Sequence, residues 1–189
     1  MPILKLSHGA ILTSETEIQQ ELACLNVQVK TYESGKLLSF GKSITQDILS
    51  YAEKEEILQY AKDIQLCLSE ASDFESCNPQ LGSVCYDLLV LHPGSPNLYS
   101  LIATYNRYHT HTDTEALYIL SGEAIFGFVQ PDGSQIELLL QPHDCIHIPP
   151  GCEHWFSLTA SLHCKALRHF TTADGWIPQH TGRTIDVGI

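Results

Sequence analysis

The stretch HTHTDTEALYILSG, residues 109–122, places two histidines and a glutamate just ahead of an apolar run. A strand sends alternate side chains to one face, so His109 and His111 project the same way, and Glu115 joins them if the residues between form a tight bend. Imidazole and carboxylate ligands without a thiolate suit Fe(II), Ni(II), Mn(II) or Zn(II) better than a soft metal. The stretch therefore predicts three ligands of one metal ion, whereas a lone HxH pair in a loop is usually a solvated surface feature.

A fourth ligand is expected about forty residues later, in PPGCEHWF (149–156). Two prolines and a glycine force a turn, and His154 then opens a strand that this spacing can bring opposite Glu115. Three histidines and one carboxylate leave about two positions of an octahedron open, which a bidentate substrate or dioxygen requires. His143 and His147 have a spacing that could make a second metal site, with surface or hydrogen-bonded histidines as the alternative.

The sequence around these motifs consists of short apolar runs separated by turns, which is typical of an antiparallel barrel or sandwich. Strands are predicted at about 115–120, 123–130, 134–140, 144–148, 154–158 and 163–170. The dipeptide Asp132-Gly133 predicts a hairpin turn between two of them.

The first part of the chain is predicted to be mostly helical. A helix from about Glu15 to Cys24 follows Ser14, which forms a capping box with Glu17, and apolar residues at helical spacing between 44 and 68 predict one long helix or two. Further elements are expected at 27–33 (an edge strand), 72–83 (a loop), 84–93 (a buried strand) and after Asn97 (a brief helix).

Composition restricts the partners of the chain. The 189 residues carry a net charge of −12, which disfavours nucleic acid and anionic lipid surfaces. No stretch is long and apolar enough for a membrane span, and the first residues are too weakly apolar for a secretory signal, so a cytoplasmic location is expected. Seven cysteines without a CxxC pair are expected to be reduced.

Both ligand motifs resemble signatures of the cupin superfamily. HTHTDTEALYILSG is similar to the first signature, HxHxxxE followed after six residues by a glycine, here Gly122, and PPGCEHW is similar to the second, PxGxxH. Three positions depart from these signatures: Ala103 and His143 stand where they usually open with glycine, and Leu158 stands where the second often ends in asparagine. We expect these positions to shape turns rather than to bind metal.

Within the cupins, the chain resembles the acireductone dioxygenases of methionine salvage. The resemblance is carried by EIQQEL (17–22), PPGCEHWF and DGWIPQHTGRTI (174–185), and it covers most of the chain. It implies a mainly β, cupin-type antiparallel β-barrel with additional N-terminal helices. As a single domain, the chain would comprise a mostly helical region (1–83) packed on the barrel, the cupin barrel itself (84–175) and a C-terminal tail (176–189).

The resemblance also implies an activity. His109, His111, Glu115 and His154 would bind one Fe(2+) or Ni(2+) per chain. The enzyme would cleave an ene-diol, acireductone (1,2-dihydroxy-3-keto-5-methylthiopentene), with O2. In this family iron gives formate and the 2-keto acid precursor of methionine, and nickel gives carbon monoxide as well. The expected partners are a small-molecule substrate and O2, with neither nucleic acid nor membrane, for a monomer or small homo-oligomer.

One departure concerns the substrate side of the site. The family usually has an arginine two residues after the ligand glutamate, and this sequence has Leu117 there. Arg168 falls where the family carries a second arginine, and it is the predicted catalytic residue, with a salt bridge at the barrel rim as the alternative. Tyr105, Leu117, Phe156 and Trp176 are predicted to wall the pocket, although aromatic residues in a small barrel are more often simply core.

Leu117 also keeps two other functions open. One is a cupin metalloenzyme for a different substrate, either an oxygenase of another diketone or ene-diol or an isomerase. The other is a non-enzymatic protein that binds a metal or a small molecule.

Overall fold

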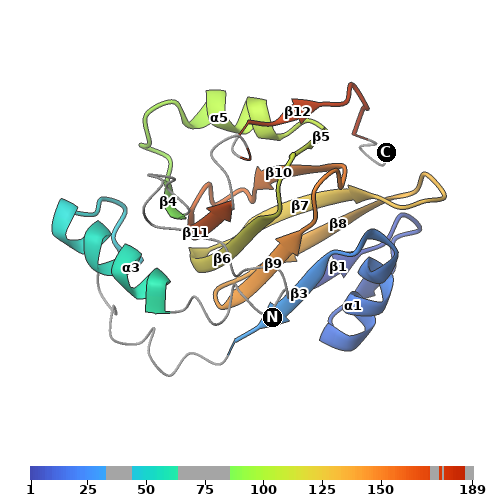
Figure 1. The fold of residues 1–189 in the computed structure, drawn as a ribbon, viewed down its shortest axis with the longest axis horizontal. Helices are drawn as coiled ribbons and strands as arrows, with labels where there is room; N and C mark the ends of the chain where they lie inside the picture. The colour runs from blue at the N-terminus through green and yellow to red at the C-terminus, as the bar shows by residue number, and fades with distance from the viewer. Residues whose placement is uncertain (33–43, 64–85, 171–174, 176, 186–189) are drawn as a thin grey trace.

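The protein consists of two antiparallel β-sheets with three α-helices outside them, in a computed structural model that describes residues 1–32, 44–63, 86–170, 175 and 177–185 (Figure 1). One sheet has seven strands: β1 (Ile3–Lys5), β2 (Ile11–Leu12), β5 (His109–Thr110), β7 (Ala124–Val129), β8 (Gln135–Leu140), β10 (His154–Leu158) and β12 (Gln179–His180). The other has five: β3 (Gln28–Thr31), β4 (Tyr86–Leu91), β6 (Glu115–Gly122), β9 (Asp144–Ile148) and β11 (Cys164–Phe170). The helices are α1 (Glu15–Leu22), α3 (Tyr51–Asp63) and α5 (Leu98–Tyr105), with a short 3-10 helix η1 (Ala23–Leu25) after α1.

The order of the strands is β12-β5-β10-β7-β8-β1-β2 in one sheet and β3-β9-β6-β11-β4 in the other. Strand β8 alternates buried and half-buried residues, as a strand with one face toward a core should. Its inward residues pack against those of β7 and β6 in one apolar core, to which Phe126, Leu138 and Ile119 belong. The mainly β fold of antiparallel strands with helices outside it, expected from the sequence, is confirmed.

Strand β6 is buried on both faces over most of its length. Leu117 and Ile119 belong to the core between the sheets, whereas Tyr118 and Leu120 belong to a second apolar cluster that includes Ile57 of α3. This double burial explains why its sequence reads as a continuous apolar run. The strand that starts at Glu115 is therefore held firmly at the middle of its sheet.

Helix α1 is fixed to the edge strand β3 by polar contacts. The Gln19 amide donates to the carbonyl of Val27 (2.9 Å) and accepts from the N–H of Val29 (2.9 Å). Ser14 is the N-cap residue but its side chain makes no capping hydrogen bond, so the predicted capping box is wrong. A capping box lies instead ahead of α3, where the Ser50 hydroxyl and N–H both donate to the Glu53 carboxylate (2.7 and 2.8 Å).

Two turn positions of the cupin signatures have left-handed backbone. Gly122 has a φ of +75°, and a Cβ atom there would lie 2.2 Å from the carbonyl oxygen of His163, so only glycine fits. His143 has a φ of +79°, which a residue with a Cβ atom rarely adopts. This backbone conformation explains why the signature usually has glycine where this chain has His143. The position shapes a turn, as expected.

The six strands predicted in the barrel region are confirmed as β6 to β11, and the edge strand as β3. The strand predicted at 84–93 is present as β4, but it lies at the edge of its sheet and is only partly buried, so its predicted burial is wrong. The Asp132-Gly133 turn is confirmed, with Gly133 at a φ of +86°. Strands β1, β2 and β12 were not expected. In the second helical segment, residues 44–45 are helical and α3 follows from Tyr51 after the non-helical residues 46–50, which fits two helices rather than one. The loop expected at 72–83 and the last part of the second helical segment lie outside the described residues.

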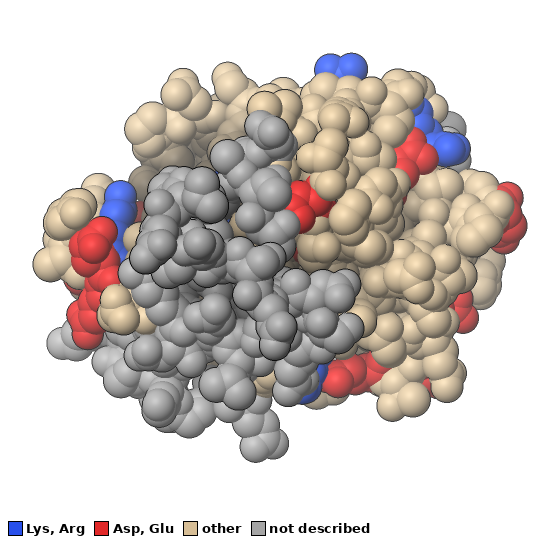
Figure 2. Space-filling model, viewed as in Figure 1, with Lys and Arg blue, Asp and Glu red and all other residues tan. Residues whose placement is uncertain are grey.

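The surface carries scattered charges. On the face in Figure 2, the described acidic side chains form several groups, and the described basic side chains lie apart from one another. None of the described helices has the length and apolarity that crossing a membrane requires. The four cysteines of the described residues, Cys24, Cys145, Cys152 and Cys164, are free thiols, as expected.

Candidate metal centre

The predicted ligands come together where the two sheets approach each other. Strands β5 and β10 are antiparallel neighbours with His109 directly opposite His154, so both side chains lie on the same face. The turn at Gly151, with a φ of +74°, donates its N–H to the carbonyl of His111 (2.9 Å). Glu115 begins β6 in the other sheet. Local strand pairing and one turn therefore gather side chains from both sheets.

The ligating atoms of the three histidines all lie within 4.8 Å of one another. The Glu115 carboxylate completes the group, with Oε2 at 3.3 Å from Nε2 of His154 and 3.7 Å from Nε2 of His111. All four side chains are buried. The four side chains are close enough together to bind a single metal ion.

No other group of three such side chains is found within the described ranges. His143 lies in the turn before β9, and its Nδ1 is 3.4 Å from the hydroxyl of Tyr118. His147 faces Ala116 of the neighbouring strand. The alternative of a second metal site at His143 and His147 is therefore not supported, and His143 has the hydrogen-bonded role that was its alternative.

The outer ring nitrogens orient two of the imidazoles. Nδ1 of His109 is 2.7 Å from the carbonyl of Arg107, and Nδ1 of His154 is 2.9 Å from the carbonyl of Cys152. A carbonyl only accepts, so each Nδ1 carries the proton and Nε2 can keep its lone pair toward the centre. Nε2 of His111 is buried and has no hydrogen-bond partner. A buried imidazole nitrogen without a hydrogen-bond partner is what a metal ligand would be in the metal-free protein.

Burial sets the charge state of these groups. Desolvation, helped by the neighbouring His154, lowers the pKa of His109 from 6.5 to about 4, and desolvation also lowers the pKa of His111. Burial alone would raise the pKa of Glu115, but when the imidazoles are protonated, a hydrogen bond from His154 and the positive charges of His154 and His111 outweigh it and lower that pKa to about 2. At neutral pH the site thus offers two neutral imidazoles and a carboxylate, which are the forms that bind metal.

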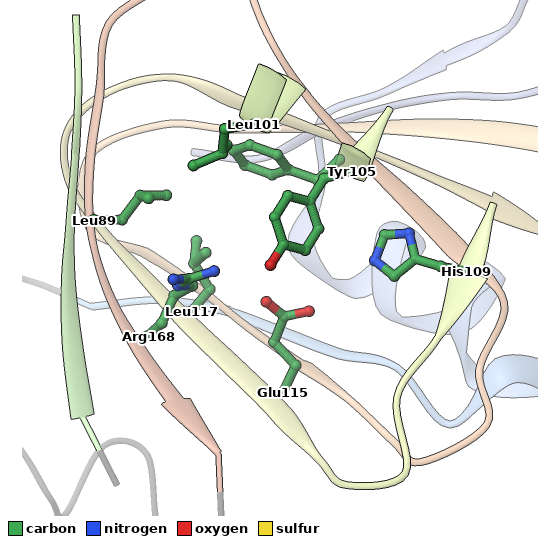
Figure 3. A pocket seen from close by; sticks show the side chains of 8 residues that line it. Leu89, Leu101, Tyr105, His109, Glu115, Leu117 and Arg168 are labelled. Carbon is green, nitrogen blue, oxygen red and sulfur yellow. The ribbon is translucent and has the colours of Figure 1, made fainter. Parts of the chain in front are cut away.

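A cavity opens beside the ligands (Figure 3). It is lined by Leu89, Leu101, Tyr105, His109, Glu115, Leu117, Phe156 and Arg168. The predicted pocket residues at 105, 117, 156 and 168 therefore all border it, whereas Trp176 lies outside the described residues. Leu89 and Leu101 were not expected, because no local pattern tells which strand or helix will pack beside β6.

The cavity is lined by both apolar and polar side chains. Figure 3 shows the Tyr105 hydroxyl directed toward the Glu115 carboxylate, with the guanidinium of Arg168 beside Leu117. Arg168 donates from Nη2 to Oδ2 of Asp87 at 2.6 Å. Burial works against its charged form, but this hydrogen bond and the negative charges of Glu115 and Asp87 together outweigh the effect, so the pKa of the guanidinium is raised. The cavity thus contains a permanent positive charge near Glu115.

Three histidines and one carboxylate at the mouth of a two-sheet antiparallel barrel are the defining features of a metal-dependent cupin. Within that class, the chain belongs to the ARD/ARD' family, whose model matches residues 13–178.

Relatives in this family align over nearly the whole chain. An acireductone dioxygenase of Nostoc sp. is 49% identical over 186 residues, covering 98% of this chain and 97% of that protein. Those of Trichodesmium erythraeum and Leptospira biflexa are 42% and 36% identical, covering 98% and 84% of this chain and 97% and 85% of those proteins. The chain is accordingly a dioxygenase, and the alternative of a non-enzymatic binding protein is set aside.

A solved structure shares the fold. An acireductone dioxygenase from Bacillus anthracis, with a cadmium ion in its active centre, superposes with a TM-score of 0.79. The match covers 95% of this chain and 98% of that one at 24% sequence identity. The two-sheet barrel with its outer helices is therefore the architecture of a known cupin enzyme.

Proposed function

We propose that this chain is an acireductone dioxygenase that binds one Fe(2+) or Ni(2+) through His109, His111, Glu115 and His154. Its substrate is acireductone, an ene-diol that it cleaves with O2 in methionine salvage. The observation that carries the proposal is the convergence of three buried imidazoles within 4.8 Å beside a carboxylate with a depressed pKa. The names of the relatives in the family support the substrate.

A bound metal ion would supply a Lewis acid that polarises the oxygens of the ene-diol. The chain's own contribution is orientation and charge balance. The carbonyls of Arg107 and Cys152 hold two imidazole rings in fixed tautomers, so the ligands need no rearrangement when the metal binds. The carboxylate of Glu115 offsets one of the two positive charges of the ion.

The walls of the cavity act on the substrate. The guanidinium of Arg168 can donate a charge-assisted hydrogen bond to an ene-diolate oxygen, which favours the deprotonated substrate. The side chains of Leu89, Leu101 and Leu117 line the same cavity and exclude water from it. Exclusion of water strengthens the interaction between Arg168 and an anion, because fewer water dipoles compete for either charge.

The test is oxygen uptake with synthetic acireductone by protein stripped of metal and reloaded with Fe(2+) or Ni(2+). The iron form should release formate and the 2-keto acid, and the nickel form should release carbon monoxide as well. An apo sample carried through the same reloading without metal is the control. Absence of turnover by both reloaded forms would refute the proposed substrate.

A second candidate rests on Leu117. Its buried side chain lies in the cavity where the family usually has an arginine, so this wall is less polar and less positive. A different diketone or ene-diol, or an isomerase reaction, fits such a wall. Parallel assays of oxygen uptake and of substrate isomerisation with uncharged diketones distinguish the two candidates, because only the second predicts a preference for them over acireductone.

The proposal includes a cellular setting. With a net charge of −12, the chain is expected to act in the cytoplasm on small molecules, without nucleic acid or membrane, as a monomer or small homo-oligomer. We propose that the N-terminal region (1–83), the barrel (84–175) and the tail (176–189) form one domain, since strands β1, β2 and β3 of the N-terminal region extend the two sheets of the barrel. Sedimentation of the purified protein measures the oligomeric state.

A further inference from the structure

The inner face of the five-stranded sheet carries its side chains in rows that run across the strands. In one row, Arg168 of β11 lies directly between Asp87 of β4 and Leu117 of β6. Residues opposite each other in a register point to the same face, so the carboxylate, the guanidinium and the leucine are side by side. The adjoining row contains the ligand Glu115, opposite Phe170.

The ion pair between Asp87 and Arg168 is short, and its two side chains differ in exposure. Nη2 of Arg168 is 2.6 Å from Oδ2 of Asp87, and the arginine side chain is 14% exposed against 43% for the aspartate. The aspartate thus pairs with the guanidinium at the rim of the barrel, and the guanidinium lines the cavity. Because β4 is the edge strand of its sheet, the aspartate keeps contact with solvent on its outer side.

Leu117 makes this contact more important. A leucine cannot donate a hydrogen bond, so the cation that lines this cavity comes from Arg168. An arginine side chain has several rotatable bonds and loses its geometry readily unless another group holds it. The carboxylates that act on Arg168 are Asp87 and Glu115. Without Asp87, the guanidinium would turn toward Glu115 or toward solvent. In either position it would no longer contact an anion bound in the cavity.

We propose that Asp87 is a positioning residue: its cross-strand ion pair holds Arg168 in the cavity as the anchor for the negative charge of the substrate. The inference rests on the proposed function for the identity of the substrate, but the contact itself can be tested with a simple anion. Asp87 does not touch the metal or the reacting atoms, so its effect should fall on binding rather than on the chemical step.

The experiment uses the full chain loaded with Ni(2+) and measures the binding of oxalate, a bidentate dianion, by calorimetry. We expect Asp87→Ala to weaken oxalate binding about tenfold, and Asp87→Asn, which keeps one acceptor but no charge, to weaken it about threefold. With acireductone, the same variants should raise KM by similar factors while kcat changes less than about twofold. Nickel content should equal that of the wild type.

The matched control is Glu137→Ala. Glu137 is also 43% exposed and pairs across strands with Lys5 at 3.3 Å, away from the cavity, so its loss should leave oxalate binding unchanged. Wild-type affinity for oxalate in Asp87→Ala overturns the inference, as does a wild-type protein that binds no oxalate. If Asp87→Ala does not fold, unchanged affinity in Asp87→Asn overturns it equally. Weakened oxalate binding in a protein inactive on acireductone would uphold the role of Asp87 and refute the proposed substrate instead.

Discussion

The four proposed metal ligands, here called the ligand row, differ from the substrate row of Asp87, Arg168 and Leu117 on the five-stranded sheet in how they are assembled. Glu115 is gathered with His109 and His111 from a stretch of seven residues, and only His154 comes from elsewhere. The substrate row joins Asp87, Arg168 and Leu117 from three strands. The ligand row keeps the family pattern, whereas position 117 departs from it. The metal side is thus fixed by local sequence, and the substrate side is free to vary with strand pairing.

The strongest way to break this comparison is His154→Ala. Loss of one of four proposed ligands should lower metal affinity by more than the roughly 10–100-fold that is typical when a group hydrogen-bonded to a ligand is removed, and oxygen uptake should fall to background. Elemental analysis and an oxygen electrode measure the two effects. The control is His163→Ala, because that half-exposed histidine pairs with Asp47 at 3.2 Å, away from the ligands. Full metal occupancy in His154→Ala would contradict the four-ligand assignment.

Arg168→Met tests the substrate row alone. Removing a charge-assisted hydrogen bond worth about 1.5–3 kcal/mol should lower kcat/KM for acireductone about 10–100-fold while metal content stays unchanged. Steady-state kinetics with elemental analysis give both values. Lys5→Met, which removes an exposed cation outside the cavity, should have no effect on either. Loss of metal together with activity in Arg168→Met would show that the two rows are not independent.

Acidification should lower the free energy of unfolding through the buried residues of the ligand row. The pKa of His109 is about 4 in the folded protein against 6.5 ordinarily, so the unfolded chain binds more protons between these values. The free energy of unfolding should therefore fall as the pH drops from about 6.5 toward 4, and Glu115 should add a further loss below about 4.5. Denaturant titrations of the apo protein across this range measure the slope. His109→Asn should flatten it, and an unchanged slope would show that His109 titrates normally.

His143→Gly should have the smallest effect, a gain of about 1 kcal/mol in the free energy of unfolding, because glycine adopts a φ of +79° without steric cost. Gly122→Ala provides the opposite sign: its Cβ atom would meet the His163 carbonyl at 2.2 Å, and overpacking of this kind costs about 1–3 kcal/mol. Thermal unfolding of both variants tests the pair. A destabilised His143→Gly protein would mean that the contact with Tyr118 outweighs the backbone strain.

The barrel could be predicted because its signals are local. Short apolar runs separated by turn residues located strands β6 to β11, and the spacing of two short motifs predicted His154 next to Glu115. The assignment of metal ligands, and of Arg168 to the substrate, remains a prediction.

What the sequence did not show is long-range pairing. Strands β1, β2 and β12 are only two or three residues long, and they form because they pair with other strands of the seven-stranded sheet. Likewise, the placement of Asp87 and Leu89 beside the ligands depends on β4 pairing with β11, about eighty residues later in the chain.

The capping boxes illustrate the same limit. Ser14 and Ser50 are each followed three residues later by glutamate, yet only Ser50 forms the box. The first turn of α1 is engaged by the edge strand instead, since the carboxylate of Glu15 accepts from the N–H of Thr31 at 3.0 Å. Identical four-residue patterns thus differ because of tertiary contacts that neither pattern encodes.

The division of the ligands between the two sheets has a mechanical consequence. His109 and His154 belong to one sheet and Glu115 to the other, so an ion bonded to all of them would cross-link the layers at a single end of the barrel. Stripping the ion should speed amide hydrogen exchange in β5, β10 and the first residues of β6, and leave β1 and β8 at the far side as slow as before.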